Sequence, residues 1–414
     1  MRATSPWLAA GLTLAVLAAV PILVFSPALP PWMATAATVF LVLAFLARAA
    51  LTGHLLGHTP ADWPLLALLL LLPVGLWASP DPAITYPRTD ALVASAALFW
   101  VVAAQRDRPW LRYSGWALLA GGVALALVVF TATSFPAKLP GVQIDISALQ
   151  ARLQTPFLQR DEFNPNLTGH VMALLLAPAV ALTLKGSGRG QRLAALLVSG
   201  LLAALLVLSQ SRGALLAALV AIPVVTVAIN WRWLWLWGPL GLLSLGAALL
   251  VGPRLQIAAL AVDTTSSINT LQGRAELWSR ALYLMQDFPF TGVGLGMPEP
   301  VIKLLYPTFL TGPDSVWSHV HNTYLQVGSE MGLPGLIAFL ALLLTVAAVL
   351  VRQVRRTQAG IYQGLSVGLL GSWSVFVVHS LVDTPTFSPI IGVSFFVLLG
   401  LMVAVATSEQ RTGD

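Results

Sequence analysis

A short polar stretch, SHVHNTYLQ at residues 318–326, holds side chains whose types and spacing could do chemistry. It carries His319 and His321, and a long apolar run follows it after a Gly-Leu-Pro-Gly break. An imidazole with an ordinary pKa of about 6.5 can accept a proton at neutral pH, as a general base must. We therefore expect His321 to be a base for a reacting hydroxyl, with a plain hydrogen-bonding role as the alternative. His319 is expected to be structural.

Two arginines far apart in the sequence could bind the phosphate groups of a substrate. Arg212 is the charged residue in the turn SQSRG (209–213), and Arg274 follows Gly273 at the start of an amphipathic segment. A guanidinium binds phosphate oxygens through a bidentate fork, so two of them could neutralise a diphosphate without a metal ion. The alternatives are that Arg212 extends to lipid phosphates and that Arg274 belongs to a solvated helix face.

The composition indicates that helices in a membrane must position these residues. Of 414 residues, 57% are hydrophobic and 9% are charged, whereas soluble domains have about 45–50% apolar and 25% charged residues. The absence of cysteine excludes disulfides and thiolate metal sites. The net charge of +6 follows membrane topology, so we expect no nucleic-acid partner.

Apolar stretches of about 20 residues can cross roughly 30 Å of hydrocarbon. Their number predicts an all-α integral membrane protein with about twelve spans, forming a single bundle over residues 1–414. The predicted spans are 7–26, 32–51, 63–79, 88–105, 111–131, 165–184, 192–208, 212–230, 233–251, 330–351, 359–380 and 387–406. The first could instead be a signal peptide, but no small-residue cleavage site follows it, which favours an uncleaved span.

Basic residues orient the predicted bundle, because cytoplasmic loops carry an excess of lysine and arginine. Both termini are then cytoplasmic. The basic loops contain Arg48, 106–112, 185–192, Arg232 and 352–356. The outer segments are 80–87, 132–164, 209–213, 252–320 and 382–389.

Two outer segments are longer than a turn. We predict a short amphipathic segment at 132–164 and a main insertion at 252–320, between the ninth and tenth spans. The insertion has apolar residues at helical spacing over 271–285, which predicts an amphipathic helix. Glu276 and Arg280 are spaced as a favourable i,i+4 ion pair on that helix.

A wider group of outer residues is predicted to bind substrate. If the segment is helical, Tyr324 shares a face with His321, which we place at headgroup height. His170, and His379 with Asp383, could line a substrate cavity or satisfy neighbouring helices. The predicted substrate-binding residues are Arg212, Arg274, Asn322, Tyr324, Arg280, Lys303, Arg88, Arg160 and His379.

Several other signals are weak or missing. GVGLG (292–296) lacks the strand-turn-helix context of a dinucleotide site. No spacing of histidine and acidic residues is typical of zinc, and no outer Asp-x-Asp pair could hold a divalent ion. We therefore expect no metal and no cofactor. Charges deep within the spans are nearly absent, which argues against an ion-coupled transporter.

Three motifs together resemble the O-antigen ligase and O-antigen polymerase superfamily of bacterial inner-membrane proteins. They are SQSRGALLAALV (209–220), GRAELWSRALYLMQDFPFTGVGLG (273–296) and HVHNTYLQVGSEMGLPGL (319–336). The resemblance implies a GT-C-like fold and metal-independent glycan transfer from undecaprenyl diphosphate on the periplasmic face. By motif, the family's functional arginines correspond to Arg212 and Arg274, and its functional histidine to His321. Arg88, Arg160 and Lys303 fall outside these motifs.

The acceptor distinguishes the two branches of this superfamily. A ligase transfers to a sugar of lipid A–core, and a polymerase to a second lipid-linked repeat unit. We expect a ligase that inverts the anomeric carbon, with a polymerase as the alternative; membrane lipids are the remaining expected partners. A lipid-linked glycan flippase or a non-catalytic assembly protein is the alternative from another class.

Overall fold

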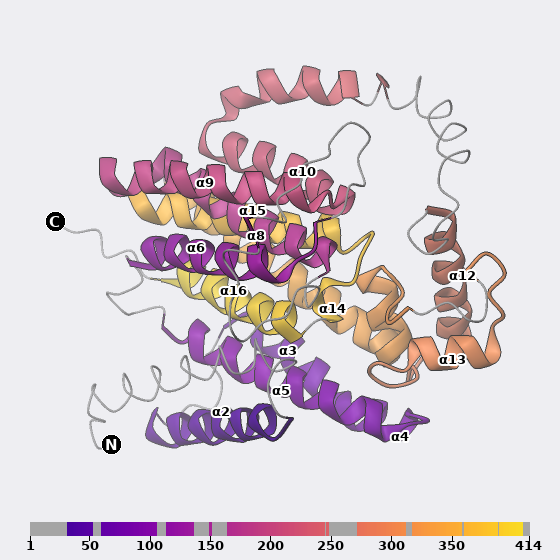
Figure 1. The fold of residues 1–414 in the computed structure, drawn as a ribbon. Coiled ribbons are helices and arrows are strands. Elements are labelled where there is room, and N and C mark those ends of the chain that lie inside the picture. Colours follow the sequence, from indigo (N-terminus) through magenta and orange to yellow (C-terminus); the bar gives the residue numbers. More distant parts are fainter. Residues whose placement is uncertain are drawn as a thin grey trace.

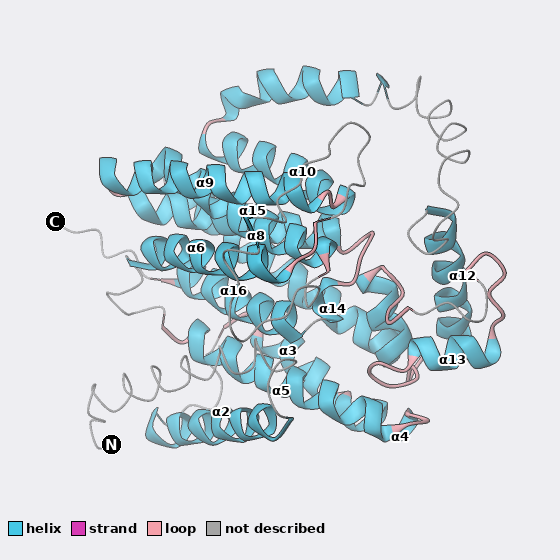
Figure 2. Cartoon of the chain, in the orientation of Figure 1, coloured by secondary structure: helices cyan, strands magenta, loops and turns pink. Residues whose placement is uncertain are grey.

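The described part of the chain is helical. The computed structural model describes residues 31–52, 59–105, 113–135, 149–150, 164–244, 246–247, 271–311, 317–357, 360–387 and 389–408 (Figure 1). Within these ranges the chain forms helices joined by loops and contains no β-strand (Figure 2). The predicted all-α class is therefore confirmed for these residues.

Helices occupy the predicted apolar stretches wherever those stretches are described. The N-terminal half contains α2 (Pro31–Thr52), α3 (Asp62–Leu70), α4 (Leu72–Ala78), α5 (Pro82–Ala103), α6 (Ser114–Ala132), α8 (Pro165–Lys185), α9 (Arg189–Ser209) and α10 (Arg212–Ile229). The C-terminal half contains η3 (Trp231–Trp233), α12 (Leu271–Asp287), α13 (Pro298–Leu305), α14 (Thr323–Arg356), α15 (Gly360–His379), η5 (Pro385–Phe387) and α16 (Pro389–Thr407). The predicted span 7–26 lies outside the described residues, as does most of the segment 132–164.

Six of the described helices, α6, α8, α9, α10, α14 and α15, are long and apolar enough to cross a membrane. The bundle leaves large apolar side chains on its surface, including Leu197 and Leu219, which suits contact with lipid. The chain is thus a multi-pass membrane protein. The count of twelve spans, the GT-C-like arrangement and the cytoplasmic termini stay predictions.

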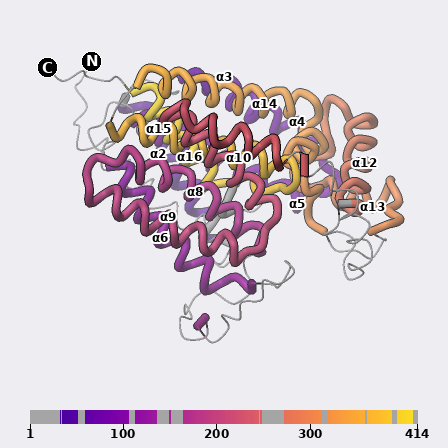
Figure 3. The backbone as a smooth tube through the Cα atoms, turned by 90° about the horizontal axis from the view of Figure 1, so that it is seen from above, coloured from indigo at the N-terminus to yellow at the C-terminus, as the bar shows by residue number. Residues whose placement is uncertain are grey.

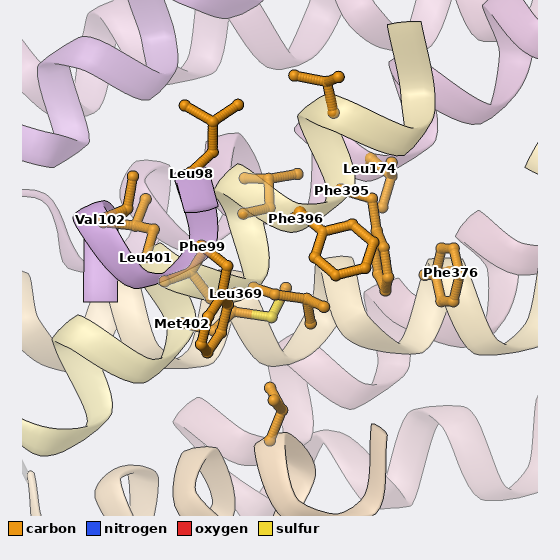
Figure 4. Packing of buried hydrophobic residues seen from close by; sticks show 14 of the residues in the cluster. Leu98, Phe99, Val102, Leu174, Leu369, Phe376, Phe395, Phe396, Leu401 and Met402 are labelled. Carbon is orange, nitrogen blue, oxygen red and sulfur yellow. The ribbon is translucent and has the colours of Figure 1, made fainter. Parts of the chain in front are cut away.

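Large side chains from helices far apart in the sequence form the core. Figure 4 shows Phe99 of α5, Leu174 of α8, Phe376 of α15 and Phe395 of α16 in one cluster. The rings of Phe376 and Phe395 stack with centroids 3.7 Å apart. Because such cores are close-packed, the ends of these helices are held in fixed positions relative to one another.

The loops that carry the polar motifs gather at one end of the bundle, here called the site end. There, Thr133 after α6 bonds Thr168 at the start of α8 (2.7 Å between hydroxyl oxygens). The N–H of Thr323 donates to the carbonyl of Ser380 across 2.9 Å. Figures 1 and 3 both show α12 and α13 beyond this end of the long helices. These segments all belong to the side that the charge pattern predicts to be outer.

Helix α14 is broken at the predicted Gly-Leu-Pro-Gly. Gly332 has φ 68° and ψ −173°, a conformation that residues other than glycine rarely adopt. The N–H of Leu333, freed from the helix by the break, donates to the carbonyl of Pro289 at 2.7 Å. The predicted kink is confirmed, and it lets the loop after α12 pack against α14.

Candidate active site

His321 lies in the loop that leads into α14, not on the helix. Helix α14 begins at Thr323, with Asn322 as its N-cap, and His321 has a left-handed φ of 55°. The expectation that His321 and Tyr324 share a helical face is therefore wrong. The Tyr324 hydroxyl donates instead to the carbonyl of Val377 on α15 (3.0 Å). The carbonyl of His321 accepts a bond from the indole of Trp278 on α12 (3.3 Å).

One carboxylate oxygen organises both histidines of the motif. Asp383 Oδ1 lies 3.1 Å from His321 Nδ1 and 3.2 Å from His319 Nε2, and it also accepts the N–H of Thr384 at 2.9 Å. Burial alone would raise the pKa of Asp383, but the hydrogen bonds from His319 and His321 hold that pKa well below its usual value. Asp383 is therefore an anion that can only accept hydrogen bonds.

An anionic Asp383 fixes the tautomers of both rings. His321 must carry its proton on Nδ1 to donate to the carboxylate, which leaves the lone pair on Nε2. Burial lowers the pKa of His321, the hydrogen bond that its Nδ1 donates to Asp383 opposes this, and the nearby His319 and Arg274 lower the pKa further. The ring is thus neutral at pH 7, as a general base requires. His319 donates through Nε2, and its Nδ1 can accept from the Ser318 hydroxyl at 2.9 Å.

The two arginines lie beside this cluster. Arg212 is the first residue of α10, which the side chain of Ser211 caps. Arg274, near the start of α12, donates through Nη1 to the carbonyl of Val382, the neighbour of Asp383. Burial lowers the pKa of Arg274, the Asp383 carboxylate raises it, and the positive charge of Arg212 lowers it. The structure thus brings Arg212, Arg274 and His321 into one electrostatically coupled region.

Glycine allows the turn before α10 to approach this region closely. A Cβ on Gly213 would lie 2.7 Å from His379 Cδ2 and 2.9 Å from a methyl group of Val382. A Cβ on Gly169 would lie 2.6 Å from the Ser209 hydroxyl. The sequence SRG therefore needs its glycine to place Arg212 next to the segment that carries Val382.

His379 forms a buried pair with His170 instead of facing solvent. Their Nδ1 atoms are 2.7 Å apart and their rings are stacked, so one ring donates and the other accepts. This pairing agrees with the alternative that these histidines satisfy neighbouring helices. Contact between His379 and substrate stays a prediction.

Three further predicted substrate-binding residues are engaged by partners within the fold. The Asn322 side chain accepts from the N–H of Leu325 and donates to the carbonyl of Leu381, each at 3.0 Å. Arg280 pairs with Glu276 at 3.7 Å, which confirms the predicted i,i+4 pair, and Lys303 pairs with Glu299 at 2.8 Å. Their roles with substrate stay predictions. Arg160 lies outside the described residues.

A cavity of about 610 Å³ begins next to Asp383, between α3, α5, α14 and α16. Arg88, Gln326, Glu330 and Thr384 give part of its wall a polar character, and apolar side chains line most of the rest. Among the described residues, the buried hydroxyl of Thr384 has no hydrogen-bond partner. Such a cavity suits a largely apolar molecule with a polar end.

Three side chains of this site are also of the types that bind metals. Among the described residues, donor atoms of His319, His321 and Asp383 lie within 4.8 Å of one another. The two bonds to one carboxylate account for this geometry without an ion. Metal independence stays a prediction that chelation can test.

Sequence reasoning missed the contact between Asp383 and His321. It placed Asp383 near the outer edge of the membrane, but 62 residues separate the two side chains in the chain. The sequence did offer one indication, because Asp383 is an acidic residue in the loop that follows a predicted span. Only packing of α14 against α15 shows which histidines that acid meets.

These observations define a helical membrane protein with a histidine-carboxylate pair and two arginines at one end of its bundle. Residues 197–340 match the family model described as O-Antigen ligase, a range that includes Arg212, Arg274 and His321. This match agrees with the resemblance to the O-antigen ligase and polymerase superfamily and supports ligase- or polymerase-type activity in general. A comparison with curated proteins found no match.

Proposed function

We propose that this protein is an O-antigen ligase. It transfers a glycan from undecaprenyl diphosphate to a sugar hydroxyl of lipid A–core, at the periplasmic face of a bacterial inner membrane. The observation that carries this proposal is the bond between His321 Nδ1 and Asp383, beside the coupled pair Arg212 and Arg274. In a chain that matches this family model over residues 197–340, that arrangement supplies a base and an anion clamp.

His321 is the general base of the proposed reaction. Its Nε2 takes the proton of the acceptor hydroxyl as the hydroxyl oxygen attacks the anomeric carbon. The bond from that carbon to the diphosphate oxygen breaks, and its electron pair leaves with the diphosphate. Asp383 stabilises the imidazolium that forms, as a carboxylate does for the histidine of a catalytic triad. Attack opposite the leaving group inverts the anomeric carbon.

Arg212 and Arg274 stabilise the leaving group. The departing undecaprenyl diphosphate gains negative charge as the glycosidic bond breaks. Guanidinium groups placed where this charge develops lower the barrier most, because they need no reorganisation. Arg274 is already held by the carbonyl of Val382, so its position is set before substrate arrives. No step of this scheme requires a metal ion.

The cavity beside Asp383 supports a lipid-borne substrate. Its apolar wall lies within the bundle, and its polar residue Thr384 directly follows Asp383. A hydrocarbon chain in this space would leave its polar end near His321 and the arginines.

Transfer with purified components tests this function. The protein in lipid nanodiscs receives an undecaprenyl-diphosphate glycan and either a lipid A–core acceptor or a second lipid-linked unit, without ATP. A ligase extends the core acceptor, and a polymerase extends the lipid-linked unit. Product on neither acceptor would contradict the proposal and favour a flippase or an assembly protein.

Chelation and stereochemistry sharpen the same assay. Addition of EDTA should leave the rate unchanged; a loss that Zn²⁺ or Mg²⁺ restores would indicate a metal at His319, His321 and Asp383. NMR of the product should show the anomeric configuration opposite to that of the donor. Retention would contradict single-step attack by the acceptor.

A further inference from the structure

A buried carboxylate that the proposed reaction does not use lies beneath the site. Glu330 of α14 is 8% exposed, and its Oε1 accepts from Gln326 Nε2 at 2.7 Å and from the N–H of Gly296 at 2.8 Å. Its backbone carbonyl accepts the N–H of Gly294 at 3.0 Å. Glu330 thus joins α14 to the loop that follows α12.

Arg88 adds the start of α5 to this network. Its guanidinium interacts electrostatically with Glu330 and Glu299. A Cβ on Gly296 would lie 2.1 Å from Arg88 Nε, so the side chain packs directly against that backbone. A carboxylate that is buried, as that of Glu330 is, persists only when its partners satisfy it.

Gln326 connects the network to the proposed base. While its amide nitrogen donates to Glu330, its Oε1 accepts the N–H of Val320 at 2.9 Å. Val320 is fully buried and directly precedes His321. The peptide unit between His319 and Val320, one residue before His321, is therefore tied to Glu330 through one side chain.

His321 needs such a tie because its backbone is strained. It is one of two residues other than glycine with positive φ among those described. Strained residues persist only where the surrounding structure over-determines them, and they concentrate at functional sites. The bond to Asp383 holds the ring of His321, and the bond at the N–H of Val320 holds the backbone one residue before it.

We propose that Glu330 and Gln326 are positioning residues that hold His321 in its left-handed conformation against Asp383. The proposal rests on the proposed function for its kinetic consequence, but not for its structural one. Arg88, predicted from the sequence to bind substrate, acts in this scheme by balancing the charge of Glu330. In this proposal, neither Glu330 nor Gln326 touches the reacting atoms.

Hydrogen exchange tests the tie without any assay of activity. In full-length protein in nanodiscs, exchange of the Val320 amide should be roughly threefold to tenfold faster in Gln326→Leu, as expected for loss of one hydrogen bond. Gln353→Leu is the matched control, since Gln353 is a buried glutamine at the far end of the same helix. Unchanged Val320 exchange in Gln326→Leu would overturn the proposal, whatever the transfer rate.

Transfer kinetics test whether loss of the Gln326 bond impairs His321 as the base. Gln326→Leu should lower kcat by about 10- to 100-fold with little change in the donor KM, because a misplaced group costs rate more than binding. Gln353→Leu should keep the wild-type kcat. An unchanged kcat per folded molecule in Gln326→Leu, with only a lower Tm, would show a merely structural role and overturn the proposal.

A conservative variant separates position from charge. Glu330→Gln keeps an oxygen for Gln326 and Gly296, so it should retain Val320 protection and most of the kcat, whereas Glu330→Leu should lose both. Loss of kcat in Glu330→Gln with Val320 still protected would mean that the charge acts directly, and would overturn the proposal. If the wild type transfers no glycan, the proposed function fails, but the exchange result still decides whether Gln326 anchors Val320.

Discussion

His321 and His379 both lie near Asp383 but differ in what their Nδ1 atoms contact. His321 bonds the carboxylate, and its side chain is 12% exposed. His379 bonds His170 and is 2% exposed. A histidine held by a carboxylate at an accessible edge has a fixed tautomer and a lone pair for substrate, whereas two histidines paired in the core can exchange donor and acceptor roles and are withdrawn from solvent. Position at the same end of the bundle, which both histidines share, does not by itself distinguish a base from a structural residue.

Substitution of His321 should lower the transfer rate more than any other change discussed below. His321→Ala should lower the transfer rate about 10²- to 10⁴-fold, the usual contribution of a general base, while donor binding survives. His379→Gln should keep most of the rate, because its side chain can still hydrogen-bond His170. Initial rates with purified donor and acceptor measure both. Equal losses in the two variants would remove the distinction between the two histidines.

The fold was predictable where the bilayer requires long stretches of apolar residues. Apolar stretches predicted α8, α9, α10 and α15 closely, because a bilayer requires long uninterrupted apolar helices. Gly332 and Pro334 predicted the break in α14 for a local reason, since neither residue supports a continuous helix. Residues 271–285 predicted α12 by their spacing.

The site was predictable in its residue types but not in its connections. Arg212, Arg274 and His321 were identified by motif, and packing alone brings them together. The left-handed φ of His321 is accompanied by its own bonds to Trp278 and Asp383 and by the bond from Val320 to Gln326, and no local pattern shows these contacts. The pairing of His170 with His379 spans 209 residues and depends on α8 packing against α15.

Arg212 and Arg274 are expected to act on the leaving group and not on the base. Arg274→Ala should lower kcat by on the order of 10²- to 10³-fold, as removal of one donor to a developing negative charge does. Arg212→Ala should also weaken donor binding. Titration with a labelled polyprenyl diphosphate separates binding from rate. Wild-type binding and rate in both variants would contradict a diphosphate clamp.

Asp383 is expected to contribute less than His321 but more than the surrounding residues. Asp383→Asn should lower kcat by about 10²-fold, because the amide allows the wrong tautomer of His321 and cannot stabilise its imidazolium. His319→Gln is the control, as it removes the other partner of the same oxygen and should cost far less. ¹⁵N NMR of the histidines would report the tautomer. A retained Nδ1–H tautomer and rate in Asp383→Asn would contradict this role.

The pH profile tests the direction of the His321 pKa. Burial lowers this pKa below 6.5, and a base works only when it is unprotonated. The rate should therefore be flat between pH 7 and 8 and fall as pH drops through the lowered pKa, below 6.5. In His321→Ala the acid limb should vanish from the residual rate. An acid limb with its midpoint above 7 would contradict a base of lowered pKa.

The smallest effects are expected at basic residues that have acidic partners. Arg280→Ala and Lys303→Ala each remove one member of a pair with Glu276 or Glu299. The Lys303 pair is partly exposed and the Arg280 pair is loose at 3.7 Å, and even surface pairs contribute only roughly 0–1 kcal/mol, so the donor KM and kcat should change less than about threefold. Arg274 differs because it meets a backbone carbonyl beside Asp383, which leaves its charge directed at the site. A donor KM raised tenfold in Arg280→Ala or Lys303→Ala would restore the role predicted from sequence and extend the clamp onto α12 or α13.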